Sequence, residues 1–241
     1  MSFPTVVAIL AGPVLLAIAM GSVLLRRALA KTDVLLEEVA LAFAWVFIVG
    51  SLVWLGVFLS GSTLLGFGAP WTWLTAAHFA FAGFGALTVT SGCCRVVSKA
   101  RALRFLRVIL FVHPMAYAVT AAGILGHPYC DELGSMTYEI LFVVQLGAVV
   151  FGQPDRMARG PRRVLILALA VPVVTLVPAI AWAWNRPFLD MAGMIRFHGL
   201  INAVGHVGLG LAALVWGRPP SHSASPHREP SRMVPGQRPD S

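Results

Sequence analysis

Seven long apolar runs divide the sequence, and each is close to the length of a membrane-crossing helix. A helix needs about 20 mostly apolar residues to cross the hydrocarbon core of a bilayer, since each residue advances about 1.5 Å. Charged residues make up only 12% of the chain, whereas soluble domains usually carry about 25%. The runs therefore predict an all-α membrane protein, a bundle of seven transmembrane helices. The predicted helices cover residues 3–25, 39–60, 71–92, 103–125, 136–152, 163–184 and 194–216.

The basic residues fall almost entirely on one side of this predicted bundle. Of the 18 Lys and Arg residues, 16 lie around the loops after the first, third and fifth runs or in the C-terminal segment. The two exceptions are Arg186 and Arg196. Positive charge concentrates in the cytoplasmic loops of membrane proteins. We therefore expect the N-terminus outside and the C-terminus in the cytoplasm. The net charge of +8 then reflects topology and attraction to anionic lipid headgroups, so no nucleic-acid partner is expected.

The composition changes sharply after residue 216. Residues 217–241 are rich in Pro, Ser and Arg and contain almost no apolar side chains. Such a segment buries too little apolar surface to offset the entropy lost on folding. We expect a seven-helix transmembrane domain over residues 1–216 and a disordered cytoplasmic tail over residues 217–241.

Few ionisable side chains lie within the predicted spans, and four polar residues fall at one depth. An ionisable group inside a membrane is costly, so each is a candidate functional residue. His78 lies seven residues past Trp71, about 10 Å below the start of its span. Glu139 lies in the first turn of the fifth predicted span, while His198 and Asn202 lie one and two turns into the seventh. All four are expected in one layer, in the outer half of the bilayer.

The neighbours of these residues favour the interior of the bundle. His198, Asn202 and His206 follow one another at four-residue spacing and so share one helix face. Small residues surround this stripe and also follow the first histidine in 78-HFAFAGFGA-86, which permits close approach of neighbouring helices. The candidate substrate-binding residues of this interior are His113, Tyr117, Tyr138 and His206.

The polar layer indicates acid–base chemistry. An imidazole facing a partly desolvated carboxyl suits proton transfer to or from a lipophilic substrate, as in epoxide opening, double-bond migration or cyclisation. The candidate catalytic residues are His78 and His198, which would exchange protons, Glu139 as acid or charge partner, and Asn202 to orient a substrate oxygen. Two histidines and a glutamate also form some catalytic zinc sites. The sequence has no HExxH or comparable spacing, so we expect neither a metal nor a cofactor.

Several functional classes are excluded by the residues that the sequence lacks. A retinal Schiff base needs a lysine in the last span, but Lys31 and Lys99 are the only lysines and fall in predicted cytoplasmic loops. No Walker-type or dinucleotide-binding glycine motif is present, and no GxSxG nucleophile motif. A retinal photoreceptor, a nucleotide-binding enzyme and a serine hydrolase of that type are therefore excluded.

Two motifs resemble those of a known family. The sequence matches HFxFAGF at 78-HFAFAGF-84 and RxHGxxNAxG at 196-RFHGLINAVG-205. In both motifs the chain resembles the YndJ-like family of bacterial membrane proteins, and the resemblance covers its membrane core. It implies a multi-pass protein of the bacterial cytoplasmic membrane and points to the same histidines without naming a reaction. The family often has an aromatic residue or His after the first histidine and Phe after NAxG, where this chain has Phe79 and His206.

We therefore expect a membrane-embedded, cofactor-independent isomerase or cyclase that acts on a lipophilic, polyketide- or terpenoid-like substrate. Small membrane cyclases of those pathways look similar in size and in their few intramembrane acids, which is an analogy only. Two alternatives stay open. The same layer would serve a small-molecule transporter or binding protein, and Asn and His side chains also link helices structurally in membrane subunits.

Overall fold

The computed structural model describes residues 1–222, in which seven helical spans are long and apolar enough to cross a membrane. Four spans are single helices: α1 (Phe3–Leu29), α2 (Leu36–Ser60), α5 (Ala100–Ile124) and α6 (Cys130–Phe151). The third consists of α3 (Trp71–His78), the π-helix η1 (Phe79–Gly85) and α4 (Ala86–Val96). The sixth consists of α7 (Arg159–Thr175) and α8 (Val177–Ala183). The seventh consists of α9 (Met191–Met194), the π-helices η2 (Ile195–Leu200) and η3 (Asn202–Gly208), and α10 (Leu209–Gly217).

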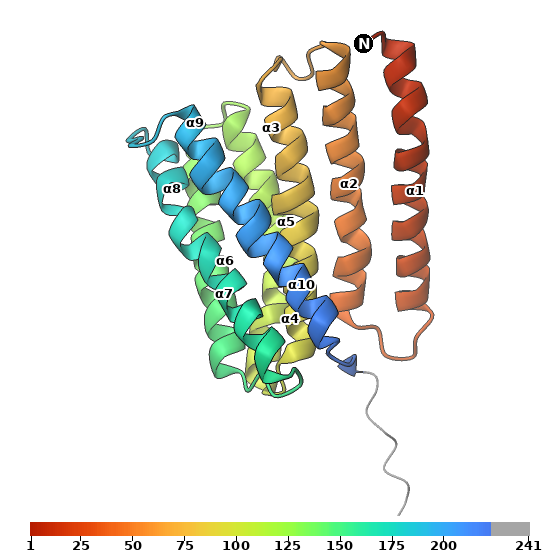
Figure 1. Ribbon diagram of the computed structural model, residues 1–241, viewed down its shortest axis with the longest axis vertical. Coiled ribbons are helices and arrows are strands. Elements are labelled where there is room, and N and C mark those ends of the chain that lie inside the picture. The colour runs from red at the N-terminus through yellow and green to blue at the C-terminus, as the bar shows by residue number, and fades with distance from the viewer. Residues whose placement is uncertain (223–241) are drawn as a thin grey trace, which may run out of the picture.

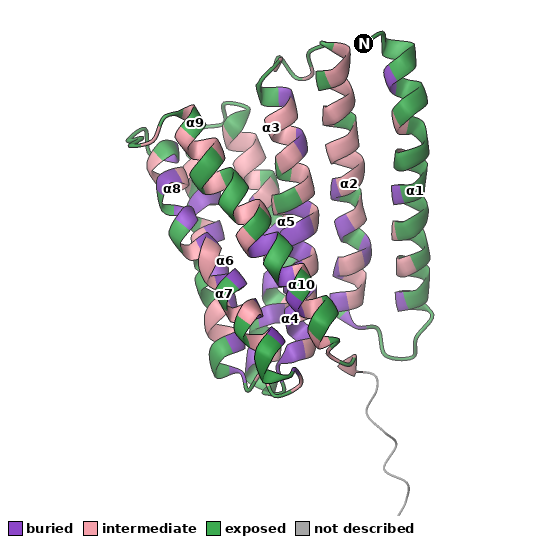
Figure 2. Ribbon diagram, in the orientation of Figure 1, coloured by how far each residue is buried: buried purple, intermediate pink, exposed green. Residues whose placement is uncertain are grey.

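The spans run alternately in opposite directions, and α1 stands at one edge of the bundle, packed against α2 (Figure 1). The third span is the most buried of the seven and α1 the least, as Figure 2 shows for α4 and α1. One end of the bundle, here called the basic end, holds residues 30–35, 97–99, 152–158 and 218–222. The opposite end holds the connections 61–70, 125–129 and 184–190.

The third and seventh spans pack closely through their small residues. A side chain at Gly85 would overlap Val207 of η3, and a side chain at Gly210 of α10 would meet Val89 of α4. Small residues let membrane helices approach closely in this way. Both spans also contain π-helical turns, which are rare and often mark functional sites. Each motif noted in the sequence lies at such a turn.

Hydropathy alone places the start of the fifth span too late. α6 begins at Cys130 rather than at residue 136, and Asp131 and Glu132 occupy its first turn. Acidic side chains there stabilise a helix by facing its positive end, although they lower the apolar content of the segment. Glu139 is consequently the tenth residue of α6, about 13 Å from its start, and not a residue of the first turn.

Ion pairs hold the basic end together. The carboxylate of Glu37, which has no exposed surface, accepts a hydrogen bond from Nε of Arg107 at 3.2 Å. Glu38 accepts one from Nζ of Lys31 at 2.6 Å. Arg107 belongs to the second turn of α5. The Glu37–Arg107 pair joins α2 to α5, and the Lys31–Glu38 pair ties the α1–α2 loop to α2.

The segment after α10 is also in contact with the basic end. Nε2 of His222 lies 2.8 Å from the carbonyl oxygen of Cys94, and its ring also lies beside the guanidinium of Arg156. Ser221 donates to Glu38 at 3.5 Å. The predicted disorder of residues 217–241 does not hold for Gly217, which ends α10. From residue 223 onward that prediction lies outside the described residues.

Candidate intramembrane histidine site

The third and seventh spans bring His78 and His198 together, as their depths predict. His78 is the last residue of α3, and His198 lies in η2. Their ring centroids are 6.2 Å apart and their planes differ by 32°. Each residue lies seven positions after the start of its span, about 10 Å along the helix from the opposite end of the bundle.

Backbone carbonyls fix which nitrogen of each ring carries hydrogen. Nδ1 of His78 lies 3.1 Å from the carbonyl oxygen of Leu74, and Nδ1 of His198 lies 3.0 Å from that of Thr175. A carbonyl oxygen only accepts hydrogen bonds, so Nδ1 is the donor in both rings. Nε2 of each neutral imidazole is therefore an unprotonated lone pair. Both Nε2 atoms are available to a ligand.

Asn202 adds a third acceptor beside the pair. Its Nδ2 donates to the carbonyl oxygen of His198 at 2.8 Å. This orientation leaves Oδ1 enclosed and without a hydrogen-bond partner among residues 1–222. The three free groups, two imidazole nitrogens and one amide oxygen, all accept hydrogen bonds. A ligand that satisfies them must therefore donate hydrogens, as a hydroxyl does.

The pair lies where the two spans separate. Closer to the basic end they pack through η1 and η3 and through α4 and α10. At the pair, His78 is exposed on the protein surface, while His198 and Asn202 are half-buried. An exposed imidazole at this depth is unfavourable against hydrocarbon alone. The site is thus reachable from the side of the bundle and suited to a ligand with both apolar and polar parts.

A second, closed histidine cluster lies deeper in the bundle. The ring of His113 is 5.2 Å from that of Tyr138 and 6.4 Å from that of Phe142, and Phe142 is 5.1 Å from His206. His113 and His206 are 1% and 2% exposed. The hydroxyl of Tyr138 donates to the carbonyl oxygen of His113 at 3.5 Å. Three of the four predicted substrate-binding residues are thus neighbours, but they are enclosed.

Irregular turns of neighbouring helices supply the partners of both enclosed histidines. Nδ1 of His206 lies 3.0 Å from the carbonyl oxygen of Ala168. Pro172 occupies the position whose N–H would normally bond that carbonyl, and proline has none. Nε2 of His113 lies 2.8 Å from the carbonyl oxygen of Ala82 in η1. The second nitrogen of each ring is buried without a partner in the described chain.

Tyr117 and Glu139 lie apart from the open pair. Tyr117 packs between Phe47 and Phe79, with ring centroids 4.9 and 5.1 Å away. Glu139 is half-buried, and its Oε2 has no hydrogen-bond partner in the part of the chain that the structure describes. Within that part, no three His, Cys, Asp or Glu side chains are arranged to hold a metal ion. The two histidines and the glutamate therefore do not form one three-residue cluster.

Sequence reasoning passed over the buried pair Glu37–Arg107. Glu37 precedes the predicted second span, and Arg107 lies in the first turns of the predicted fourth span, where a basic residue is expected to face the cytoplasmic surface. Two consecutive glutamates before an apolar run were the available signal, because acidic residues favour a helix start. Gln145, which lies 3.4 Å from Thr90 through its Oε1 and 3.6 Å from Cys93 through its Nε2, is a second buried polar centre.

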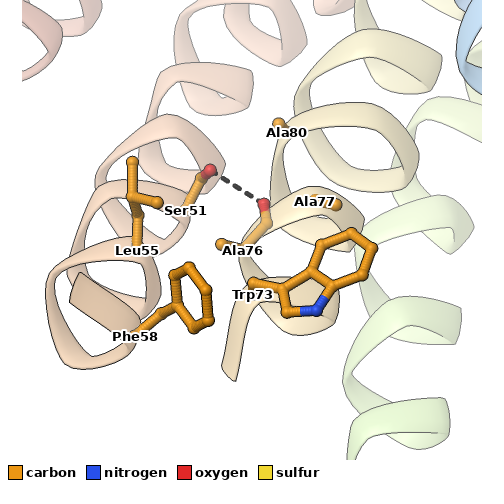
Figure 3. A pocket seen from close by; sticks show the side chains of 7 residues that line it. All are labelled: Ser51, Leu55, Phe58, Trp73, Ala76, Ala77 and Ala80. Atoms are coloured by element: carbon orange, nitrogen blue, oxygen red, sulfur yellow. Dashed lines mark hydrogen bonds between the residues drawn. The ribbon is translucent and has the colours of Figure 1, made fainter. Parts of the chain in front are cut away.

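An apolar groove on the outside of the bundle lies between α2 and α3 (Figure 3). Its volume is about 420 Å³. The hydroxyl of Ser51 donates to the carbonyl oxygen of Ala76 at 2.8 Å, so its hydrogen is already used within the protein (Figure 3). Its lining residues are Ser51, Leu55, Phe58, Trp73, Ala76, Ala77 and Ala80. The groove suits hydrocarbon, and His78 is not part of it.

Comparison with known protein families shows which family the chain belongs to. The model of a family described as YndJ-like protein matches residues 3–206. The chain belongs to the YndJ-like family. The match includes all four histidines of the open and closed clusters, so both lie in the part that this YndJ-like chain shares with its family. No curated protein and no solved structure matches the chain significantly.

Proposed function

We propose that this YndJ-like protein is a membrane-embedded, cofactor-independent acid–base enzyme, an isomerase or cyclase for a lipophilic, polyketide- or terpenoid-like substrate. The observation that carries the proposal is the open pair, with two imidazole rings 6.2 Å apart at one depth. Each ring has its Nδ1 engaged by a carbonyl and its Nε2 free. Two neighbouring free bases suit the removal of a proton at one atom and its return at another.

The expected topology supports access from the lipid. With the basic end in the cytoplasm, as the positive-inside rule indicates, the pair lies in the outer half of a bacterial cytoplasmic membrane. The N-terminus is then outside. A lipophilic substrate reaches the pair by lateral diffusion in that leaflet, and the α2–α3 groove offers a neighbouring surface for hydrocarbon.

Epoxide opening illustrates the proposed step. His78 first takes up a proton at its free Nε2, so the step begins with His78 as imidazolium and His198 neutral. Nε2 of His198 takes the proton of a substrate hydroxyl while that oxygen attacks an epoxide carbon and the carbon–oxygen bond of the epoxide breaks. Nε2–H of His78 gives its proton to the released oxygen, so substrate and product are isomers. Proton transfer between the rings then restores the starting state, and Oδ1 of Asn202 accepts a hydrogen bond from a substrate hydroxyl.

Glu139 takes no part in this exchange. We assign the proton exchange to His78 and His198 alone because those two rings face each other.

The test compares lipid-soluble metabolites from strains with and without the gene, separated by chromatography because isomers share a mass. We expect one compound to accumulate without the gene, and His78→Ala or His198→Ala to reproduce that accumulation. Loss of general acid–base catalysis lowers the rate about 10²–10⁴-fold. His127→Ala is the matched control, because His127 is exposed in the loop between α5 and α6.

Unchanged product in both His78→Ala and His198→Ala strains, with each variant inserted in the membrane, would contradict the proposal. A compound that changes compartment but not structure when the gene is removed would also contradict it, and would favour a transporter.

A further inference from the structure

A recess opens on the exposed face of α5, in the first turns of that helix at the basic end. Its volume is about 220 Å³, and it is lined by Arg101, Arg104, Phe105 and Val108. Residues three and four apart are neighbours on a helix surface, so the two arginines and the two apolar side chains share one face. All four side chains are exposed, and a molecule beside the bundle can reach them.

The two arginines of the recess have no ionic partner among residues 1–222. Arg107, in the next turn of α5, is paired with the buried Glu37, but neither Arg101 nor Arg104 takes part in an ion pair. Cζ of Arg101 lies 5.8 Å from the ring centroid of Phe105. This cation–π contact uses the flat face of the guanidinium and leaves its N–H groups available. The positive charge of the recess is therefore available to an anion outside the chain.

Exposed apolar side chains continue from the recess along the same face of α5, toward the middle of the bundle. At three- or four-residue spacing, and between 47% and 71% exposed, these are Phe105, Val108, Phe111 and Met115, here called the apolar strip. From Arg101 to Met115 the helix rises about 21 Å. That is about half the thickness of a bilayer with its headgroups. The face is thus cationic at its end and apolar over the depth of one leaflet.

We propose that the recess binds an anionic phospholipid, with the phosphate at Arg101 and Arg104 and the hydrocarbon chains along the apolar strip. Guanidinium groups donate paired, charge-assisted hydrogen bonds to phosphate oxygens. A free phosphate ion would leave the apolar strip uncovered, and a zwitterionic phospholipid has no net charge to attract two cations. The site lies at the opposite end of the bundle from the histidine pair, so it does not depend on the proposed reaction.

The experiment titrates the purified, delipidated full chain in a neutral detergent with phosphatidylglycerol, and native mass spectrometry measures the lipid that each molecule retains. A basic side chain beside an anionic lipid contributes about fivefold to binding, so Arg101→Gln/Arg104→Gln should weaken the first binding step about 30-fold. Phosphatidylcholine should bind the wild-type chain at least about tenfold more weakly than phosphatidylglycerol does, because it has no net charge.

The matched control is Arg159→Gln/Arg163→Gln. Both arginines are exposed in the first turns of α7 at the same end of the bundle, and neither lines the recess. The control removes the same charge from a helix that packs on α6 and the seventh span. Charges further away than about 8 Å are largely screened at physiological ionic strength, so phosphatidylglycerol affinity should change less than about twofold.

A third variant separates the recess from its charge. Phe105→Ala keeps both arginines but removes the ring beneath Arg101 and the start of the apolar strip. Binding of phosphatidylglycerol should weaken about two- to fivefold, the value of an exposed cation–π contact. Elution volume and thermal unfolding in detergent establish that each variant is folded before the titration.

Three results would overturn the proposal. Equal losses in the two double-arginine variants would show attraction by net charge alone, without a site. Equal affinity of the wild-type chain for phosphatidylglycerol and phosphatidylcholine would show that the two arginines select no anion. Displacement of the lipid by an equal concentration of glycerophosphoglycerol, which has the headgroup but no chains, would indicate a site for soluble phosphate esters instead.

Discussion

The open and closed histidine clusters follow the same hydrogen-bond pattern and differ in what surrounds the second ring nitrogen. In all four rings one nitrogen faces a backbone carbonyl. In the open pair the other nitrogen has no hydrogen-bond partner among residues 1–222, and its residue is exposed (His78) or half-buried (His198). In the closed cluster it is buried.

This difference gives histidine two roles in the bundle, one in proton exchange with a substrate and one in bonding a helix carbonyl. A ring whose free nitrogen is reachable can exchange a proton with a substrate. A ring whose free nitrogen is enclosed serves the helix whose carbonyl it bonds, and reaches other groups only through neighbours within the bundle. Helix irregularity provides three of the four carbonyls: Thr175 ends α7, Ala82 lies in η1, and Ala168 lacks its usual donor at Pro172. The fourth, that of Leu74, lies four residues before His78 within α3.

Chemical modification would separate the clusters most strongly. Diethyl pyrocarbonate attacks unprotonated imidazole nitrogen, so His78 and His198 should react in the folded protein. His113 and His206 should react about a thousandfold more slowly, because a buried group is reached only when the structure opens. Peptide mass spectrometry after timed exposure measures the four rates. Similar rates for all four rings in folded protein would remove the distinction.

The free energy of unfolding should depend more on the closed cluster than on the open pair, which is the reverse of the order of chemical reactivity. His206→Ala removes a buried ring, leaves the carbonyl oxygen of Ala168 without its donor and opens a cavity, so we expect a loss of about 3 kcal/mol. His78→Ala removes an exposed ring whose partner lies in its own helix, and should change stability by less than about 1 kcal/mol. Unfolding in detergent, followed by circular dichroism, tests both. Equal losses would contradict the comparison.

The smallest expected change in unfolding free energy tests whether His206 is needed as the donor to the carbonyl oxygen of Ala168, which Pro172 cannot bond. Pro172→Ala supplies an N–H that can bond the carbonyl oxygen of Ala168. His206→Phe should then destabilise the protein less than it does in the presence of Pro172, by about 1 kcal/mol, the value of one hydrogen bond. A double-mutant cycle of unfolding free energies measures this coupling. Additive effects of the two substitutions would show that His206 is not held there for this carbonyl.

Part of the site followed from depth alone. His78 and His198 meet because each lies seven residues into a span that starts at the same end, and equal rise per residue then gives equal depth. The same reasoning misplaced Glu139, since the start of α6 is six residues earlier than hydropathy indicated. A charged first turn is not detected by a hydropathy window, so the predicted helix started too late and Glu139 was expected in its first turn rather than about 13 Å along it.

Neither the carbonyl partners nor the enclosure of the second cluster could be predicted. Hydropathy does not show where a π-turn forms, and a proline shows which carbonyl is freed but not which side chain bonds it. The Glu37–Arg107 pair joins residues 70 positions apart. Contacts at that separation depend on how the helices are arranged and leave no local pattern.

The sequence by itself determined seven apolar helices, their alternation and a set of polar residues at restricted depths. These follow from the length of helix that a bilayer requires and from the cost of polar groups within it. Only the tertiary structure decided which histidines face an opening and which are enclosed. That outcome depends on how closely glycine-rich spans approach, and on which carbonyls irregular turns leave for an imidazole to bond.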